Sequence, residues 1–408
     1  MTYPIRQIDE SAWPSINRVA EEAFSWTPAP GQSARYKAQT EFDRSLAAFD
    51  GEEMIGHTSS YGFTMTVPGA RVPVAGVTWV GVLPSHRRRG VLSSLMRAQL
   101  ADLRDRGEHV AALYASESSI YGRYGYGRAS SHLSFRIDKP GSAFVRDRPQ
   151  DPALRIRVVK PADVRSDIEK LFASVVARRP GRYDHNAAFW DSVLGDEDFD
   201  QHGAGPLRGL LAEDDGGVRG YALFRVQQKW TDGIADGELR LRGVEATDPA
   251  AYALLWRSLL DRDLVSQVVA HGRPVDDPII ALLADQRRLR VAVQDELWVR
   301  LVDVDRALAS RAYTTPVDLV IEVEDDVCPW NAGRHRLTGG PSGATCEPVD
   351  DAPDVTLPVA ALGSAYLGDG QLDEHLAAGL LREHSPGALR ALAVAMSWSP
   401  KPWCGSGF

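Results

Sequence analysis

Apolar positions in the first part of the chain alternate between helical and strand spacing. In the segment 11–24 they recur every three or four residues, which predicts an amphipathic helix. The following stretch, 45–84, is rich in β-prone residues and is interrupted at Asp50-Gly51 and Pro68-Gly69. Such dipeptides are typical of tight turns. The pattern therefore predicts a meander of strands after the first helix.

A second amphipathic helix is predicted over 91–106, with Gly107 at the position where a helix C-cap is expected. A short apolar run at 109–116 then predicts another strand. A charged, proline-rich passage follows and is typical of a linker or an exposed hairpin. We therefore expect a first unit of alternating helices and strands that ends near residue 150.

Residues 151–300 repeat this alternation. The pattern predicts helices at 164–179 and 249–264 and a hairpin at 209–230. The organisation is similar to that of the first unit, but the basic glycine turn found at 87–90 has no counterpart. We interpret the second unit as a degenerate copy of the first.

From residue 301 the character of the chain changes. Short β-prone runs precede helical patterns at 371–384 and 386–398, which is typical of an α+β domain. The expected fold class is thus α+β overall, with two tandem α/β units followed by a smaller domain. The predicted boundaries are 1–150, 151–300 and 301–408.

Composition and charge exclude several classes of protein. The 408 residues carry a formal net charge of -9, which argues against general nucleic-acid binding and favours cationic small substrates. Three cysteines without Cys-x-x-Cys spacing fit neither a disulfide framework nor a zinc site. No run approaches the roughly 18 apolar residues that span a bilayer. We expect a cytoplasmic protein outside the membrane, with non-classical export left open.

The segment 74–96 carries the strongest chemical signal in the chain. A β-rich run is stopped by Pro84, because proline has no amide hydrogen for a strand ladder. We expect the strand to splay there, which would free the amides of Val80 and Val82. These amides would bind an extended ligand that itself contains amides, such as a pantetheine arm.

A basic turn then leads into the predicted helix. Gly90 permits close approach of the backbone, and the first amides of the helix favour an anion. The three preceding arginines add charge-assisted contacts to phosphate. A solvated helix start is the alternative, but Asp or Ser would suit that role better. Neither a Rossmann nor a Walker motif occurs. The predicted pyrophosphate and cofactor contacts are Val80, Gly81, Val82, Arg87, Arg88, Arg89, Gly90, Val91, Leu92 and Ser93.

The pair Arg87-x-x-Gly90, between a strand and a helix, resembles motif A of the GNAT superfamily of acetyltransferases. HRRRGVLSSLM together with ASESSIYGRYGYGRAS resembles the Eis (enhanced intracellular survival) family, and this resemblance covers the whole chain. It implies two GNAT-type domains, of which only the first binds acetyl-CoA, followed by a sterol-carrier-protein-like domain. Leu92 stands where the superfamily usually has Gly or Ala, a departure that Eis-like sequences share.

The resemblance also implies the catalytic residues. Acetyl transfer from a thioester to an amine needs a proton for the departing thiolate and an acceptor for the proton of the amine. Tyr121, which follows SESSI, is implied as the general acid, and the terminal carboxylate of Phe408 as the general base. We interpret Tyr124 and Tyr126 as packing residues. Further cofactor contacts, mainly through backbone atoms, are expected from Ser116 and Glu117.

The end of the chain is unusually apolar for a terminus. The tail from Trp398 to Phe408 includes Trp403, and these aromatic side chains favour a docked end over a disordered one. Simple packing of the last helix is the alternative interpretation. An α-carboxyl group ordinarily titrates near pH ~3.5, so action as a base would require desolvation.

The acceptor is less well specified by the sequence. By resemblance it is a primary amine, namely an aminoglycoside acetylated at several positions, a protein lysine or another small amine, and the implied pocket is wide and acidic. In this chain AFSWTPAPGQSARY has no acidic residue, and the penultimate residue is Gly407. Trp26, Tyr36 and Trp79 are candidates to line an aromatic pocket that binds a cation through ring faces. Core packing is the alternative for each of them.

A second class of function is a lipid-binding or partner-binding scaffold with a vestigial GNAT site, although the intact turn at 87–91 argues against it.

We predict no metal site. His57 and His86 are interpreted as hairpin and turn side chains, and Asp325-Asp326 and Asp350-Asp351 as solvated loop charges. The resemblance also implies a homohexamer.

Overall fold

The computed structural model describes residues 3–408 and divides into two compact units. The first unit contains the chain up to Ser130, the short segment Arg179–Tyr183, and Asp295–Phe408. The second contains Ser131–Arg178 and Asp184–Gln294. Within the described residues, no helix is both long enough and apolar enough to cross a membrane.

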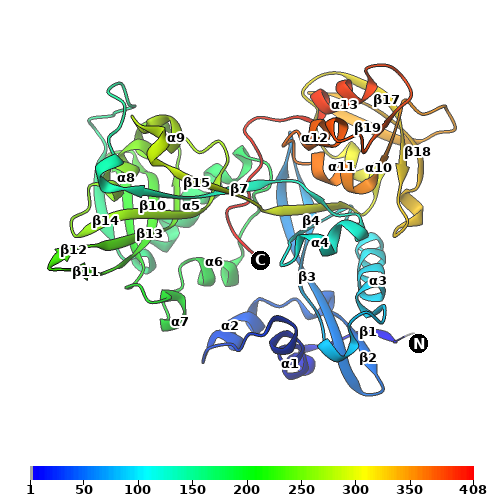
Figure 1. Ribbon diagram of the computed structural model, residues 1–408, viewed down its shortest axis with the longest axis horizontal. Coiled ribbons are helices and arrows are strands. Elements are labelled where there is room, and N and C mark those ends of the chain that lie inside the picture. The colour runs from blue at the N-terminus through cyan, green and yellow to red at the C-terminus, as the bar shows by residue number, and fades with distance from the viewer. Residues whose placement is uncertain (1–2) are drawn as a thin grey trace. The chain divides into compact units, whose positions relative to one another are not determined.

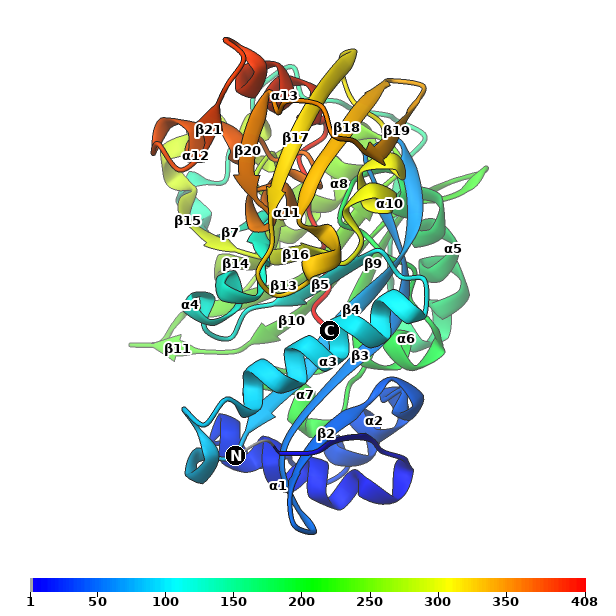
Figure 2. The same cartoon turned by 90° about the vertical axis from the view of Figure 1, so that its right-hand side faces the viewer.

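A seven-stranded sheet forms one half of the first unit (Figures 1 and 2). In spatial order its strands are β1 (Ile5–Gln7), β2 (Leu46–Asp50), β3 (Glu53–Val67), β4 (Ala70–Val82), β5 (Val110–Tyr114), β16 (Leu297–Leu301) and β6 (Gly127–Arg128). The helices of this half are α1 (Trp13–Phe24), α2 (Gln32–Gln39), α3 (Val91–Asp105) and α4 (Ser118–Tyr121). Strands β3 and β4 form a long antiparallel hairpin, whereas β4 and β5 are parallel and connected through α3. The predicted helices and strand breaks in this region are confirmed.

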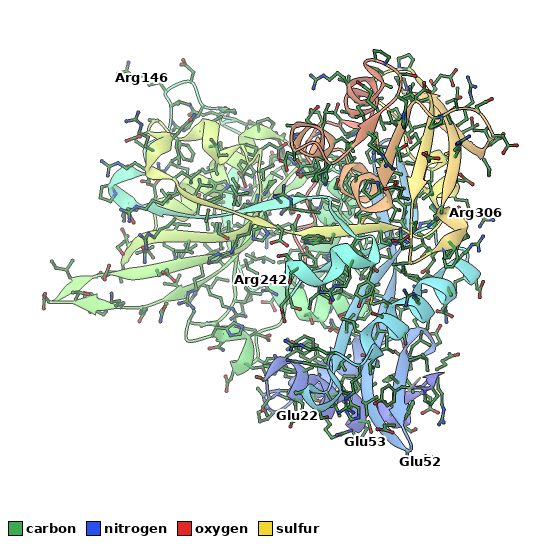
Figure 3. All side chains as sticks on the ribbon, turned by 45° about the vertical axis from the view of Figure 1, so that its right-hand side comes forward. Glu22, Glu52, Glu53, Arg146, Arg242 and Arg306 are labelled. Atoms are coloured by element: carbon green, nitrogen blue, oxygen red, sulfur yellow. The ribbon has the colours of Figure 1, made fainter. Side chains whose placement is uncertain are left out.

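Helices α1 and α3 cover opposite faces of this sheet. A methyl group added to Gly81 of β4 would contact α1, whereas one added to Gly56 of β3 would contact α3. Gly56 and Gly81 lie at adjacent register positions of the β3–β4 ladder, so their faces must differ. At the turn between β2 and β3, the side chains of Glu52 and Glu53 extend outwards (Figure 3).

Strand pairing crosses the boundaries that the sequence predicts near 150 and 300. After β6 the chain leaves the first sheet, and β7 (Ser131–Asp138) pairs in the sheet of the second unit. The chain returns at β16, which pairs with both β5 and β6. The second unit thus contains β7, from the predicted first domain, and the first unit contains β16, from the predicted second domain. Such pairing depends on contacts between distant residues, and local hydrophobic patterns do not predict it.

The second unit contains a sheet of the same size. In spatial order its strands are β15 (Arg290–Asp295), β7, β14 (Val265–Pro274), β13 (Gly237–Ala246), β10 (Gly217–Gln227), β9 (Arg208–Asp214) and β8 (Arg155–Val159). Its helices are α5 (Arg165–Val175), α6 (Ala187–Val193), α7 (Asp198–Gln201), α8 (Pro249–Leu260) and α9 (Ile279–Leu282), and a small hairpin is formed by β11 (Trp230–Thr231) and β12 (Ile234–Ala235). The parallel pair β13–β14 is connected through α8, as β4–β5 is through α3.

The start of α8 explains why this unit lacks a phosphate turn. Its N-cap residue, Asp248, accepts hydrogen bonds from the backbone amides of Ala250 and Ala251, both at 3.0 Å. The carboxylate is also paired with Arg219 at 2.9 Å. The protein's own acid therefore occupies the position at which a helix would bind an external anion.

The remainder of the first unit is an α+β domain, as predicted. Its sheet runs in the order β19 (Gly343–Pro348), β18 (Gly333–Gly340), β17 (Val317–Glu324), β20 (Val355–Pro358) and β21 (Arg382–Glu383). Its helices are α10 (Val304–Ala309), α11 (Val359–Ala365), α12 (Gln371–Ala377) and α13 (Ala388–Met396). Helix α11 packs directly on β16 and β6. Two glycines allow this approach, because a Cβ on Gly127 or Gly363 would overlap the facing backbone.

A buried ion pair joins the first sheet to this α+β domain. The side chains of Arg300 on β16 and Asp325 are 0% and 1% exposed, and their nearest nitrogen and oxygen atoms are 2.5 Å apart. Asp325 also accepts hydrogen bonds from the amides of Val327 and Cys328. The interpretation of Asp325 as a solvated charge is therefore wrong, while its neighbour Asp326 is exposed. An Asp-Asp pair in a polar loop looks solvated in the sequence, because its partner lies 25 residues away.

We expect the substitution Asp325→Ala to lower the free energy of unfolding by about 3–5 kcal/mol, because it leaves a buried guanidinium without a counter-charge. Asp326→Ala is the matched control and should change that free energy by less than about 0.5 kcal/mol. Urea denaturation followed by circular dichroism measures both. Equal effects of the two substitutions would contradict the assigned role of the ion pair.

Candidate active site

Strand β4 is irregular at the position where the sequence predicts a splay. His57 pairs with Gly81 and Ser59 pairs with Thr78, so the ladder register shifts between them. Two residues of β4 therefore oppose one residue of β3, which is the arrangement of a β-bulge. Trp79, within the bulge, has a φ of 55°, a value that is uncommon for residues other than glycine. The bulge turns the backbone groups of this segment out of the regular ladder.

Strands β4 and β5 pair over only a short length. The pairing is recorded at Ala75 with Ala111 and at Gly76 with Ala112, whereas β4 continues to Val82 and β5 to Tyr114. The two strands therefore separate beyond Gly76. Their backbone groups on the facing sides become accessible to a ligand with amide groups of its own.

No side chain of the described residues caps the start of α3. Its N-cap is Gly90, with a φ of 82° and no side-chain cap, and a Cβ at Gly90 would meet nothing within 4 Å. The first intrahelical bond runs from the amide of Ser94 to the carbonyl of Gly90, so the amides of Val91, Leu92 and Ser93 precede the ladder. This end of α3 thus has the backbone geometry of an anion site.

The three arginines of the turn are exposed. Arg87 donates to the backbone carbonyl of Ala23 at 3.1 Å, and Arg89 lies 3.5 Å from the hydroxyl of Tyr3. Arg88 has a φ of 59°. A left-handed residue two positions before Gly90 makes the turn tight and brings its amides together. His86 is a turn residue, as predicted, and lies 3.2 Å from Asp50.

Tyr121 ends the short helix α4 and is 5% exposed. Its ring lies in the apolar cluster that includes Ala75 and Val77 of β4 and Leu113 of β5. Burial raises the pKa of Tyr121 to about 12, so the hydroxyl is protonated at neutral pH. Ser116, which is exposed like Glu117, contributes a hydrogen bond to Tyr121 that opposes this rise in pKa.

The other two tyrosines of this loop are buried, in agreement with their interpretation as packing residues. Tyr126 is fully buried, and its ring centroid lies 6.0 Å from that of Tyr121. Tyr124 contacts Ser93, with 3.1 Å between the hydroxyl oxygens. The hydroxyl of Ser93, a predicted cofactor contact, is therefore engaged by the loop that carries Tyr121.

The C-terminal tail is docked in the first unit, as the aromatic pattern predicts. Glu296, just before β16, accepts hydrogen bonds from the amides of Cys404 and Gly405 at 3.0 and 3.1 Å. The ring of Trp403 is 5% exposed and lies under the guanidinium of Arg182. Together these contacts hold the tail three to five residues before Phe408.

The last residues reach the point at which β4 and β5 separate. The hydroxyls of Tyr114 and Tyr183 both donate to the carbonyl of Ser406, at 3.1 and 3.3 Å. The ring of Phe408 makes edge contacts with Tyr114 and with Phe63 of β3, at centroid distances of 5.3 and 5.2 Å. Both views of the ribbon show the C-terminus beside β3 and β4 (Figures 1 and 2).

A glycine makes room for this terminal ring. A Cβ at Gly76 would lie 3.1 Å from the ring of Phe408 and would also overlap the ring of Phe63. Burial raises the pKa of Tyr114 and that of Tyr183, so both hydroxyls stay protonated and can donate. No sequence pattern pointed to Glu296, Tyr114, Tyr183 or Phe63. Each lies in a strand or loop that carries no motif, and only the folded chain brings them to the tail.

The three candidate pocket aromatics do come together. Tyr36 makes edge contacts with Trp26 and with Trp79, at centroid distances of 5.8 and 5.5 Å. All three side chains are partly exposed. Trp13 completes the group from the buried side, with its ring centroid 5.7 Å from that of Trp79. The group therefore combines one buried ring, Trp13, with three partly exposed rings beside the bulge of β4.

Comparison with known proteins agrees with this arrangement. Residues 4–129 and 181–301 each match a model of an acetyltransferase (GNAT) domain, and 304–405 match a sterol carrier protein domain. The chain is 32% identical to N-acetyltransferase Eis of Mycobacterium tuberculosis, over 97% of each chain. The chain belongs to the Eis family of N-acetyltransferases.

Other similar proteins support this family assignment. A Streptomyces avermitilis protein described as an uncharacterized N-acetyltransferase is 42% identical, over the full length of both chains. The crystal structure of Eis1 from Mycobacterium abscessus is 34% identical and covers 99% of this chain and 100% of its own, with a TM-score of 0.84. The predicted order of two GNAT domains and a sterol-carrier-like domain is thus confirmed, and the protein is an N-acetyltransferase.

Proposed function

We propose that this Eis-family enzyme transfers the acetyl group of acetyl-CoA to a primary amine, with Tyr121 as general acid and the carboxylate of Phe408 as general base. The observation that carries the proposal is the position of Phe408. Its ring packs against Gly76 and Tyr114, where β4 and β5 separate. The terminal carboxylate belongs to the same residue, which supports a role for it beside the strands that would hold the thioester.

The donor would bind along β4 and at the start of α3. The amides of Val91, Leu92 and Ser93 and the side chains of Arg87, Arg88 and Arg89 suit a pyrophosphate. The pantetheine arm would pair with Val80, Gly81 and Val82, with Ser116 and Glu117 as further contacts. The second GNAT domain has no such role in the proposal, because Asp248 caps its equivalent helix.

In the reaction, the free amine attacks the thioester carbon, the carbon–sulfur bond breaks and the amine loses a proton. The carboxylate of Phe408 would orient the incoming ammonium and accept its proton, directly or through water. Tyr121 would donate to the departing sulfur. Because its pKa of about 12 lies above that of a thiol, ~8.5, complete transfer of its proton to the thiolate is unfavourable, and its hydrogen bond would stabilise the negative charge that develops on the departing sulfur.

The proposed acceptors are aminoglycosides, modified at several amines, with protein lysines or other small amines as the close alternative. The partly exposed aromatics Trp26, Tyr36 and Trp79 support a cationic acceptor through their ring faces. The overall charge of -9 also favours a cationic substrate over an anionic one. The free cysteines suit a reducing compartment, so we propose the cytoplasm.

Family resemblance further suggests a homohexamer. In the second unit the hairpin of β11 and β12 exposes Trp230 and Ile234, which are 60% and 72% accessible. Large apolar side chains at such a tip are typical of contact surfaces, which supports assembly.

We expect acetyl-CoA consumption with at least one member of a panel of kanamycin-type aminoglycosides, polyamines and lysine peptides. Acetyl-CoA at 100 times its dissociation constant should also stabilise the fold by about 2.7 kcal/mol. Thiol release and thermal unfolding measure the two effects. Absence of both would favour the lipid-binding or partner-binding scaffold instead.

For Tyr121→Phe, we expect kcat to fall by roughly 10²- to 10⁴-fold with little change in the KM for acetyl-CoA, because only the proton donor is lost. Tyr126→Phe is the matched control, since the buried hydroxyl of Tyr126 has no hydrogen-bond partner and should be dispensable. Steady-state kinetics of both variants test the assignment. A similar kcat for the two variants would move the acid role elsewhere.

Extension of the chain by two residues after Phe408, or deletion of Phe408, should reduce transfer on the order of 100-fold or more while acetyl-CoA binding persists. Either change displaces the terminal carboxylate without altering α3. Phe408→Leu, which retains the carboxylate at the same position, separates its role from ring packing and should keep more activity than either change. Full turnover in the extended enzyme would exclude the proposed base.

A further inference from the structure

In the β-bulge of β4, the backbone carbonyl of Trp79 is hydrogen-bonded to a polar side chain of β3. This side chain is His57, whose Nδ1 lies 3.1 Å from the carbonyl oxygen of Trp79. His57 is 1% exposed and pairs in the ladder with Gly81, on the face that α1 covers. A hairpin side chain of no particular consequence, as the sequence suggested, would not require this buried position.

The protonation of His57 follows from its partner and its burial. A carbonyl oxygen only accepts, so Nδ1 must carry the hydrogen. Burial lowers the pKa of His57 to about 4, which leaves the ring neutral and Nε2 without a proton. Nε2 has no hydrogen-bond partner among the described residues. From this buried position, His57 thus makes its hydrogen bond through Nδ1 to the carbonyl oxygen of Trp79.

Peptide planarity transmits this contact to the next residue. The carbonyl of Trp79 and the amide hydrogen of Val80 belong to one trans peptide unit and point in opposite directions. Because the carbonyl is held towards the ring of His57, the amide of Val80 is held in the opposite direction, away from that ring. This peptide lies in the part of β4 beyond its recorded pairing with β5, where the thioester is expected to bind.

The unusual backbone at the bulge needs such a restraint. The φ of 55° at Trp79 is unfavourable for a residue with a Cβ, and in the absence of other contacts the peptide would return to an extended conformation. The indole side chain is restrained separately, through ring contacts with Trp13 and Tyr36. His57 acts on the peptide group itself.

We infer that His57 is a positioning residue: its Nδ1–H fixes the Trp79–Val80 peptide so that the amide of Val80 donates to the thioester carbonyl oxygen as negative charge develops there. The inference rests on the proposed acetyl transfer and adds one element to it. His57 contacts no reacting atom, so it acts through Val80. A donor held in advance stabilises the transition state more than one that must be reoriented at the moment of reaction.

Three substitutions of His57 test this inference. His57→Asn places a side-chain N–H where Nδ1 lies, His57→Gln places one nearer to the position of Nε2, and His57→Leu provides no donor. We expect kcat to fall roughly tenfold in the Leu and Gln variants, with less than about a twofold change in the KM for acetyl-CoA, and to recover largely in Asn. Gln is the matched control for polarity, because it differs from Asn mainly in the position of the donor.

Infrared spectroscopy of bound acetyl-CoA, labelled with carbon-13 at the thioester carbonyl, reads the proposed hydrogen bond directly. In the wild type and the Asn variant the carbonyl band should lie at lower frequency than in free acetyl-CoA. In the Leu and Gln variants it should return towards the free value. If a His57 substitution lowered kcat only by loosening the packing, the carbonyl frequency would not change in parallel with kcat.

Several results would overturn the inference. Equal kcat and equal carbonyl frequency in Asn, Gln and Leu would exclude a positioning role, and so would an unshifted band in the active wild type. If the His57→Leu variant does not fold, the comparison of the Asn and Gln variants still shows whether a donor at the position of Nδ1 is required. Failure of the wild type to acetylate any amine would instead remove the proposed function, whereas full activity of a folded Leu variant removes only the role of His57.

Discussion

The pairing of β16 with β5 and β6 is the constraint on which the rest of the first unit depends. This strand fills the gap between β5 and β6, and it carries three separate connections within a few residues. Glu296, immediately before it, binds the amides of the C-terminal tail. Arg300, within it, forms the buried ion pair with Asp325 of the α+β domain. The facing backbone of α11 packs against it so closely that two glycines are required. A single strand thus sets the positions of the last hundred residues relative to the first sheet.

The two GNAT domains illustrate how one supersecondary arrangement supports two different outcomes. In both, a parallel strand pair is connected through a helix whose first amides face the end of the strand. In the first domain this helix begins at Gly90, which offers no side chain to those amides. In the second it begins at Asp248, whose carboxylate satisfies them internally. At the start of this helix the two domains therefore differ in whether a side chain caps the first amides, within the same arrangement of strand, helix and strand.

The sequence predicted those parts of the molecule that local chemistry determines. The helices at α1 and α3, the turns at Gly51 and Gly69, and the basic glycine turn before α3 all follow from short-range propensity and spacing. The exchange of β7 and β16 between sheets did not follow, because strand pairing between residues so far apart in the chain, such as Gln267 with Asp138 or Leu297 with Tyr114, leaves no local signal. Asp325 was misjudged for the same reason, since its burial depends on a distant arginine. The aromatic tail predicted a docked end, but its partners Glu296, Tyr114 and Tyr183 became evident only in the folded chain.

The return of the chain at β16 also determines the order in which the protein can be completed during synthesis. Domains usually fold one after another as they leave the ribosome, the N-terminal one first. Here the first sheet lacks an internal strand until the whole of the second unit has been made, and β5 presents an unpaired edge during that interval. Synthesis of the second unit is therefore a precondition for closing the sheet of the first.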